Sequence, residues 1–531
     1  MWKELSYNEK EEYRRMILAF AGLTEMFAQK ADTDEHNVIP SPIINSKYQE
    51  SVFQRVFSAV AEDIGNTSYD VSLRRDDKGV EKKYIVGIKT FGINSGLQKI
   101  AQFKAKHDEW SNIINKMKDN AQGLEKKEAI NTVNHDLYLE LAQKVSILRN
   151  DRILSAKAKL KGFKLYGQDE FVESVYHVLM PSKKGDSPMI YVGETSYNLV
   201  DVDNITVIGC TGVKNPTNFD FTDGKHTYRY TSADSQLLMN FQNKDIVLDK
   251  WDVVYAEDAY ALFSKIGEEI DKIANKNFVS GKDAVILESY SWLIAPKGEV
   301  EKYSGFNNFY SVSSKLGKDQ REKRIQKLIT SYTDKINMDV LLSVADHLSA
   351  FLMIKANTPK ERDEKNAFRK QIVEFVKQIG NEEYIKEVNK LLYRPKNEIY
   401  IPIPNAKEFH TKHPHFFGKN IGTFKPDGKT LALDKENCSF NLVFEPSGNK
   451  IRSFITQDNG KAIASLEKQS YLGEWVLREI FRLAEFEPLT MKRLNELGIN
   501  GVRIYKTNMD NDVHVQFIWI DKDNLPDDYV K

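Results

Sequence analysis

The stretch from Ser46 to Lys104 constrains the fold most strongly, because it changes from helical to strand periodicity and back within a short span. Apolar residues at helical spacing predict a helix over about Ser46–Ile64. Tyr69–Leu73 and Tyr84–Lys89 then have strand character, and the charged segment 74–79 between them is typical of a hairpin turn. This order predicts a mixed α/β core rather than an all-helical or all-strand fold.

Helical periodicity returns after this core, over residues 97–120 and again over 127–160. From Val71 to Gly162 there are about eight more basic than acidic residues, although the 76 basic and 76 acidic residues of the whole chain balance. Two interpretations stay open: solvated faces of a helix pair, or a surface that faces phosphate groups.

A chain of 531 residues is too long for one hydrophobic core, and we expect an α/β (α+β) multidomain protein. The predicted parts are residues 1–165 with a core at 40–160, a central mixed region at 166–400, and a domain at 405–531. An extended linker is predicted over 393–404, where several prolines occur.

Composition and missing motifs exclude several classes of protein. Cys210 and Cys438 are the only cysteines, which indicates a reducing compartment. The N-terminus lacks the apolar centre of a signal peptide, and no run of about 18 apolar residues occurs, so we expect a cytoplasmic protein without membrane contact. There is no phosphate-binding GxxxxGK[ST] loop, which argues against a nucleotide cofactor.

Asp70 and Lys89 are the clearest candidates for catalytic residues. Phosphodiester hydrolysis needs a cation that polarises the phosphate and activates a water molecule. Mg²⁺ is typically held by one or two carboxylates together with substrate phosphate. A lysine beside it orients the nucleophile or offsets negative charge that develops during the reaction. A carboxylate and a lysine on paired strands would supply this arrangement.

These residues resemble the PD-(D/E)xK nuclease superfamily, and within it the type II restriction endonucleases. The resemblance rests on Glu50 in YQESVF, Asp70 in SYDVSL, Lys89 in YIVGIKT and a predicted helix at KIAQFK. It implies that Glu50 and Asp70 bind Mg²⁺ and that Lys89 assists the attacking water.

One position departs from the family pattern, because Gly87 stands where the family has an acid two residues before the lysine. The acid could come from elsewhere, with Glu50 as the first choice and Asp77 or Glu81 as weaker ones. Alternatively, Asp70, the backbone carbonyl of Ile88 and water hold the ion. The strand assignment could also be wrong or the site altered, and in the simplest case Asp70 closes a turn while Lys89 is a solvated strand end.

The C-terminal part, about residues 415–520, resembles the DNA-binding pseudobarrel domains of certain restriction enzymes, including those with phospholipase-D-type nucleases. The resemblance rests on QDNGKA, LGEW and the closing VRIYK strand, while the paired HxK motif of the latter enzymes is absent. Amide and amine side chains there can contact base edges in the major groove. The predicted DNA-binding residues are Gln457, Asn459, Lys461, Arg503 and Lys506. QDNGK is equally compatible with a polar turn, and LGEW is better explained by core packing.

The segment DGKHTYRYTSADSQ adds Arg229 as a candidate DNA contact among aromatic residues. An ordinary hairpin with its tyrosine rings packed inward explains this segment at least as well.

The sequence as a whole predicts an Mg²⁺-dependent type II restriction endonuclease that cuts double-stranded DNA. The alternatives are a modification-dependent endonuclease and a catalytically degenerate DNA-binding protein. A palindromic DNA site would favour a homodimer.

Overall fold

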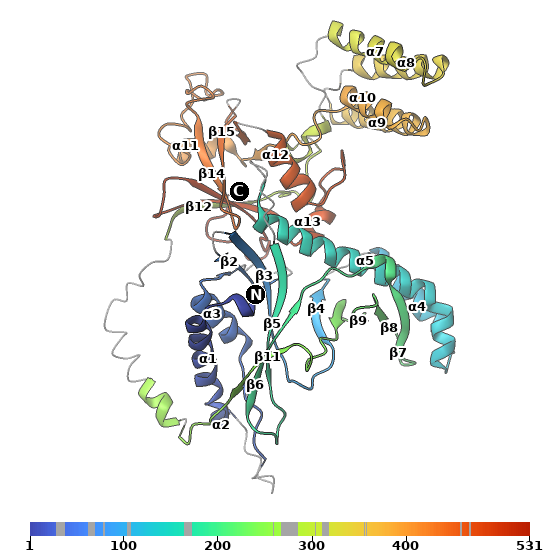
Figure 1. The fold of residues 1–531 in the computed structure, drawn as a ribbon. Coiled ribbons are helices and arrows are strands. Elements are labelled where there is room, and N and C mark those ends of the chain that lie inside the picture. The colour runs from blue at the N-terminus through green and yellow to red at the C-terminus, as the bar shows by residue number, and fades with distance from the viewer. Residues whose placement is uncertain are drawn as a thin grey trace.

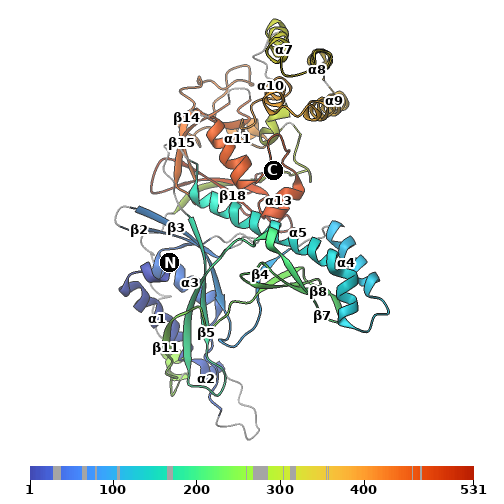
Figure 2. The same cartoon turned by 45° about the vertical axis from the view of Figure 1, so that its right-hand side comes forward.

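Three β-sheets, the helices that accompany them and a separate group of four helices make up the described part of the chain, a mixed α/β architecture (Figures 1 and 2). The structure is a computed structural model. It describes residues 1–27, 38–61, 69–77, 80–103, 108–163, 172–258, 260–266, 285–302, 304–310, 318–354, 356, 358–456, 459–466 and 469–530.

The first sheet has six strands in the order β1-β2-β3-β5-β6-β11. Their bounds are Val60–Ala61, Val71–Asp77, Val80–Thr90, Val172–Pro181, Met189–Ser196 and Val247–Asp252. The predicted hairpin is present, since β2 and β3 pair antiparallel with Val71 opposite Val86. Strand β5 pairs parallel with β3, so the sheet continues across the predicted domain boundary after residue 165.

The two faces of this sheet belong to different cores. Val86 and Ile88 of β3 share one core with Val52 and Phe53 of α3 (Ser46–Phe57), which helix α1 (Tyr7–Ala21) also joins. Ile85 of β3 belongs to the other core, which the long helix α5 (Lys127–Lys161) covers. Because successive side chains of a strand point to opposite faces, Lys89 is directed to the α5 side and Thr90 to the α3 side.

Helices α1 (Tyr7–Ala21), α2 (Thr24–Phe27) and α3 (Ser46–Phe57) precede this sheet. The prediction of a helix to Ile64 is wrong at its C-terminal end. Ser58 has a positive φ of 51° and ends α3, and β1 follows.

The second sheet has five strands in the order β4-β10-β9-β8-β7. Their bounds in chain order are Gln98–Gln102, Thr206–Gly212, Asn215–Thr222, Thr227–Thr231 and Gln236–Met239. The predicted helix at KIAQFK is therefore wrong, because residues 99–102 of this segment lie in β4, which pairs with β10; Lys104 lies outside the described residues. Its partner strand lies more than a hundred residues away, so local periodicity could not identify it.

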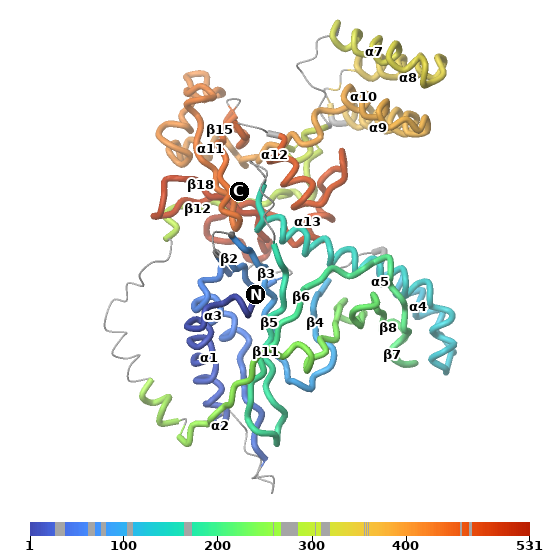
Figure 3. Tube along the Cα trace, in the orientation of Figure 1, coloured from blue at the N-terminus to red at the C-terminus, as the bar shows by residue number. Residues whose placement is uncertain are grey.

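Helix α4 (Asp108–Ala121) packs on α5 (Lys127–Lys161), and both predicted helices after the core are thus present, the first with a later start. Helix α5 runs across the molecule between the second sheet and the C-terminal part (Figure 3). Four further helices, α7 (Lys318–Tyr332), α8 (Met338–Met353), α9 (Pro359–Gln378) and α10 (Glu382–Leu392), pack around a core of their own and project from the rest of the chain (Figures 1 and 2).

The third sheet has seven strands in the order β12-β17-β18-β14-β15-β16-β13. Their bounds in chain order are Ile286–Leu293, Ile401–Pro402, Ser439–Phe444, Asn449–Ile455, Ala462–Ser465, Gly501–Thr507 and Val513–Ile518. Strands β14 and β15 pair antiparallel as a hairpin. Strand β12, from the predicted central region, pairs with β17. Helices α11 (Ala406–Lys412), α12 (Gln469–Gly473) and α13 (Met491–Leu497) and a π-helical segment η4 (Glu474–Ile480) accompany this sheet.

The end of α5 is fixed to the C-terminal part. The indole Nε1 of Trp475 donates a hydrogen bond of 2.7 Å to the carbonyl of Ala158, and the ring packs against Phe163 and Phe444. This confirms the prediction that LGEW is a packing motif. Arg493 of α13 binds Asp151 of α5 at 2.8 Å. No helix among the described residues is long and apolar enough to cross a membrane.

Candidate functional site

Asp70 and Lys89 lie together at one end of the β2–β3 hairpin. Asp70 Oδ2 is 3.8 Å from Lys89 Nζ and accepts a hydrogen bond of 2.6 Å from the backbone N–H of Ile88. The side chains are 32% and 30% exposed, respectively. An acid and a base therefore meet where solvent can reach both.

The hairpin accounts for this geometry. Asp70 directly precedes β2, and its backbone N–H still donates to the carbonyl of Val86. Its carboxylate accepts a hydrogen bond from the N–H of Ile88, two residues beyond Val86, which is the last residue of β3 paired with β2. Such a charge-assisted bond fixes the carboxylate relative to the strand that carries Lys89.

Gly87, the position that lacks the family's acid, is covered by the ring of Tyr176. A Cβ atom at Gly87 would lie 2.8 Å from Cδ1 and 2.9 Å from Cε1 of Tyr176. Tyr176 is the residue paired with Gly87 on β5, and its ring stacks on Tyr197 with centroids 4.0 Å apart. An acidic side chain at position 87 has no space beside Lys89 in this packing.

Glu50 lies on α3, which packs on the face of the sheet opposite to Lys89. Its carboxylate pairs with Lys47 on the same helix at 2.9 Å. No contact between Glu50 and Asp70 or Lys89 is found among the described residues. The structure thus brings together Asp70, Ile88 and Lys89, and the role of Glu50 as a metal ligand at this site stays a prediction.

The alternative acids Asp77 and Glu81 lie at the other end of the hairpin. In the register of β2 and β3, Asp76 faces Glu81 and Asp77 faces Val80. Eight residues of strand separate Glu81 from Lys89, which corresponds to about 26 Å. Neither residue can complete a site at Asp70 in this fold.

Among the described residues, the structure places one carboxylate, that of Asp70, at this site, which would be compatible only with a metal ion that has few protein ligands. No group of three or more histidine, cysteine, aspartate or glutamate side chains able to hold a metal occurs among the described residues. Mg²⁺ nevertheless commonly keeps several waters and binds one or two carboxylates plus substrate phosphates. Asp70 supplies such a carboxylate, and the predicted further ligands are the Ile88 carbonyl and Glu50.

The predicted DNA contacts on β17 already have partners within the protein. Arg503 Nε donates to Asp528 Oδ2 at 2.9 Å and to Ser289 Oγ at 2.8 Å. Lys506 Nζ lies 5.5 Å from the centre of the Phe416 ring. Both side chains would have to exchange these contacts for DNA.

The QDNGK segment is described only in part, since Gln457 lies outside the described residues. Asn459 adopts a left-handed conformation with φ 54°, and its N–H donates to the carbonyl of Lys429 at 2.7 Å. The carbonyl of Lys461 accepts from the N–H of Ile403 at 2.8 Å. These bonds hold the segment against two distant parts of the chain, at Lys429 and Ile403, and DNA contact by Asn459 and Lys461 stays a prediction.

Arg229 belongs to the hairpin of β8 and β9. Its guanidinium binds both carboxylate oxygens of Asp220, at 2.6 and 2.9 Å. This bond raises the pKa of Arg229 above its usual value. Tyr228 and Tyr230 are buried, as expected for an ordinary hairpin with its rings packed inward.

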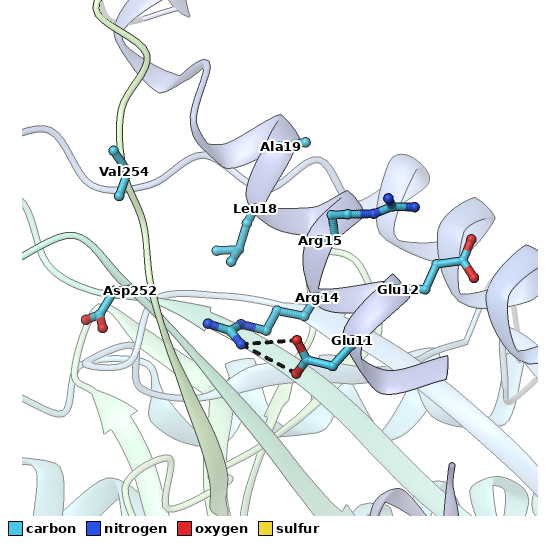
Figure 4. Close-up of a pocket in the computed structure, with 8 residues that line it drawn as sticks. All are labelled: Glu11, Glu12, Arg14, Arg15, Leu18, Ala19, Asp252 and Val254. Carbon is cyan, nitrogen blue, oxygen red and sulfur yellow. Dashed lines mark hydrogen bonds and ion pairs between the residues drawn. The ribbon is translucent and has the colours of Figure 1, made fainter. Parts of the chain in front are cut away.

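A groove of about 800 Å³ runs along α1 beside the segment 252–254 (Figure 4). Its walls combine charged and apolar side chains, and Glu11 and Arg14 pair with one another inside it. None of the predicted site residues lines this groove.

His514 of β18 lies between two carboxylates. Its Nδ1 is 3.1 Å from Glu445 Oε1 and its Nε2 is 3.2 Å from Asp510 Oδ1. The bond to Glu445 outweighs burial, and the bond to Asp510 adds to it, so that the pKa of His514 is raised. The ring also stacks on Tyr505.

This raised pKa predicts a pH-dependent stability. The stabilisation by His514 is fully present below the unfolded-state pKa of about 6.5 and is lost as the pH rises through the higher folded-state value. The difference in free energy of unfolding between the wild type and His514→Gln should therefore be larger at low pH than at high pH. Denaturant unfolding across this range checks it, with His135→Gln as a control on an exposed helix face, and a difference independent of pH would contradict it.

Two residues near the site were not predicted from the sequence. Tyr176 lies in a strand that looks like any buried strand, and its contact with Gly87 depends on a parallel pairing. Gln49 is fully buried and accepts a hydrogen bond from the hydroxyl of Thr90. A glutamine among the apolar positions of a helix was the available signal.

No protein-family model matches the sequence, and a search of the curated proteins finds no significant match.

Proposed function

We propose that the protein is a metal-dependent endonuclease of the type II restriction class, with its catalytic centre at Asp70 and Lys89. The observation that carries this proposal is the meeting of a partly exposed carboxylate and ammonium group, 3.8 Å apart, at the end of a hairpin. The surrounding order of helix, hairpin and crossover to a parallel strand supports it as well.

The metal ion and each residue of the candidate site would have a separate role in hydrolysis. A bound Mg²⁺ ion would polarise the phosphate and lower the pKa of the attacking water. Asp70 would hold this ion, with the Ile88 carbonyl and Glu50 as the predicted additional ligands. Lys89, 3.8 Å from Asp70, would orient the water and offset the negative charge that the phosphate gains as the water oxygen bonds to phosphorus and the bond from phosphorus to the departing sugar oxygen breaks.

The second candidate is a DNA-binding protein with a degenerate nuclease centre. Tyr176 favours it, because its ring fills the space that an acid beside Lys89 would need. The proposed DNA contacts are the same as those predicted for the endonuclease: Arg229, Gln457, Asn459, Lys461, Arg503 and Lys506.

Digestion of methylated and unmethylated phage DNA distinguishes these functions. We expect discrete fragments with Mg²⁺ and none with EDTA. Fragments from methylated DNA alone would identify the modification-dependent endonuclease. DNA binding in EDTA without cleavage of either DNA would contradict the endonuclease proposal and support the degenerate centre.

A further inference from the structure

A buried row of polar side chains joins α1, α3 and the sheet next to the candidate site. Gln49 of α3 and His177 of β5 are both fully buried. Tyr13 of α1 has its hydroxyl 3.2 Å from His177 Nε2, and both rings pack against Phe53 of α3. Burial raises the pKa of Tyr13.

The row ends at the strand that carries Lys89. Gln49 Oε1 accepts a hydrogen bond from Thr90 Oγ1, and Thr90 is the last residue of β3. Gln49 directly precedes Glu50, and Thr90 directly follows Lys89. This bond therefore connects the two segments that carry the predicted acid and the predicted lysine from opposite faces of the sheet.

A row of buried polar side chains with unpaired atoms lowers the stability of the fold, so stability does not explain its presence. The Nε2 atom of Gln49 and the Nδ1 atom of His177 are buried without a hydrogen-bond partner among the described residues, and a buried polar group without a partner destabilises the folded state. Apolar side chains of similar size would fill the same space without this cost. Buried polar groups do fix one arrangement of the elements that they join.

We propose that Gln49 is a positioning residue of the Asp70–Lys89 site. Its bond to Thr90 sets the start of α3, and with it Glu50, against the end of β3. This inference rests on the proposed function and deepens it, because it assigns the residue that aligns the two sides of the same metal site.

The test compares Gln49→Met, Thr90→Val and the double variant with Gln54→Met, which removes an amide at a less buried position of the same helix. Calorimetry measures Mg²⁺ binding in the absence of DNA. Steady-state kinetics of cleavage give kcat and KM, and denaturant unfolding gives the stability of each variant. We expect Mg²⁺ affinity to fall about 10-fold or more in both single variants and kcat to fall about 10- to 100-fold, with KM for DNA little changed. The double variant should be no worse than either single one, and Gln54→Met should match the wild type.

The outcomes separate this inference from the proposed function. Wild-type cleavage with unchanged Mg²⁺ affinity and kcat in Gln49→Met would overturn the positioning role alone. A wild type that binds Mg²⁺ but cuts no DNA, with weakened Mg²⁺ binding in Gln49→Met, would overturn the nuclease activity and retain the positioning role. A wild type that binds no Mg²⁺ would overturn both.

Discussion

Asp70→Asn and Lys89→Met should each lower the rate of DNA cleavage by about 10²- to 10⁴-fold. Asparagine keeps an oxygen that can accept the Ile88 N–H but removes the charge that would bind the cation. Methionine keeps the volume of the lysine stem and removes the ammonium group. Single-turnover cleavage at saturating Mg²⁺ measures both losses.

Neither substitution should unfold the protein. The Asp70–Lys89 pair is partly exposed, and such pairs contribute about 0–1 kcal/mol to stability. Glu81→Gln is the matched control, because it removes an acid at the far end of the same hairpin. Full activity of Asp70→Asn, or loss of activity in Glu81→Gln, would show that the catalytic acid has been assigned wrongly.

Gly87→Glu, which restores the acid of the superfamily pattern, should destabilise the protein instead of activating it. A Cβ atom alone would come within 2.8 Å of the Tyr176 ring. That ring is 1% exposed, stacks on Tyr197 and meets Phe241 edge-on at 5.0 Å, so it has no room to move away. We expect a loss of about 3 kcal/mol or more in the free energy of unfolding, from overpacking together with burial of a carboxylate.

Gly96→Glu is the control for this experiment. It adds the same side chain shortly after the same strand, where a Cβ atom meets nothing within 4 Å. Its unfolding midpoint in denaturant should stay close to that of the wild type. Wild-type stability of Gly87→Glu, together with faster cleavage, would mean that Tyr176 does not block the position.

The local parts of the fold could be predicted from the sequence, whereas the pairings between distant segments could not. The helix over 127–160 has a long apolar periodicity and is present as α5. The hairpins that carry Asp70 and Lys89 and that join β14 to β15 follow from adjacent strand patterns and turn residues. Segment 98–102 is a strand because β10 pairs with it, and the residues of the segment itself do not indicate which distant strand is its partner.

The same limit applies to the candidate site. Asp70 and Lys89 are neighbours within one hairpin, so their spacing in sequence was enough to place them together. The space above Gly87 depends on the parallel pairing of β3 with β5, which begins more than eighty residues later. The ion pairs of Arg229 with Asp220 and of Arg503 with Asp528 likewise depend on neighbouring strands and the C-terminal segment.

Iron-induced cleavage of the polypeptide can locate the bound metal. Fe²⁺ replaces Mg²⁺ at many such sites, and with ascorbate and peroxide it cuts the polypeptide next to the place where it is bound. We expect cuts near Asp70 and Ile88 that excess Mg²⁺ suppresses and that Asp70→Asn abolishes. Cuts confined to other segments, or cuts near Asp70 that persist in Asp70→Asn, would contradict a catalytic centre at the end of this hairpin.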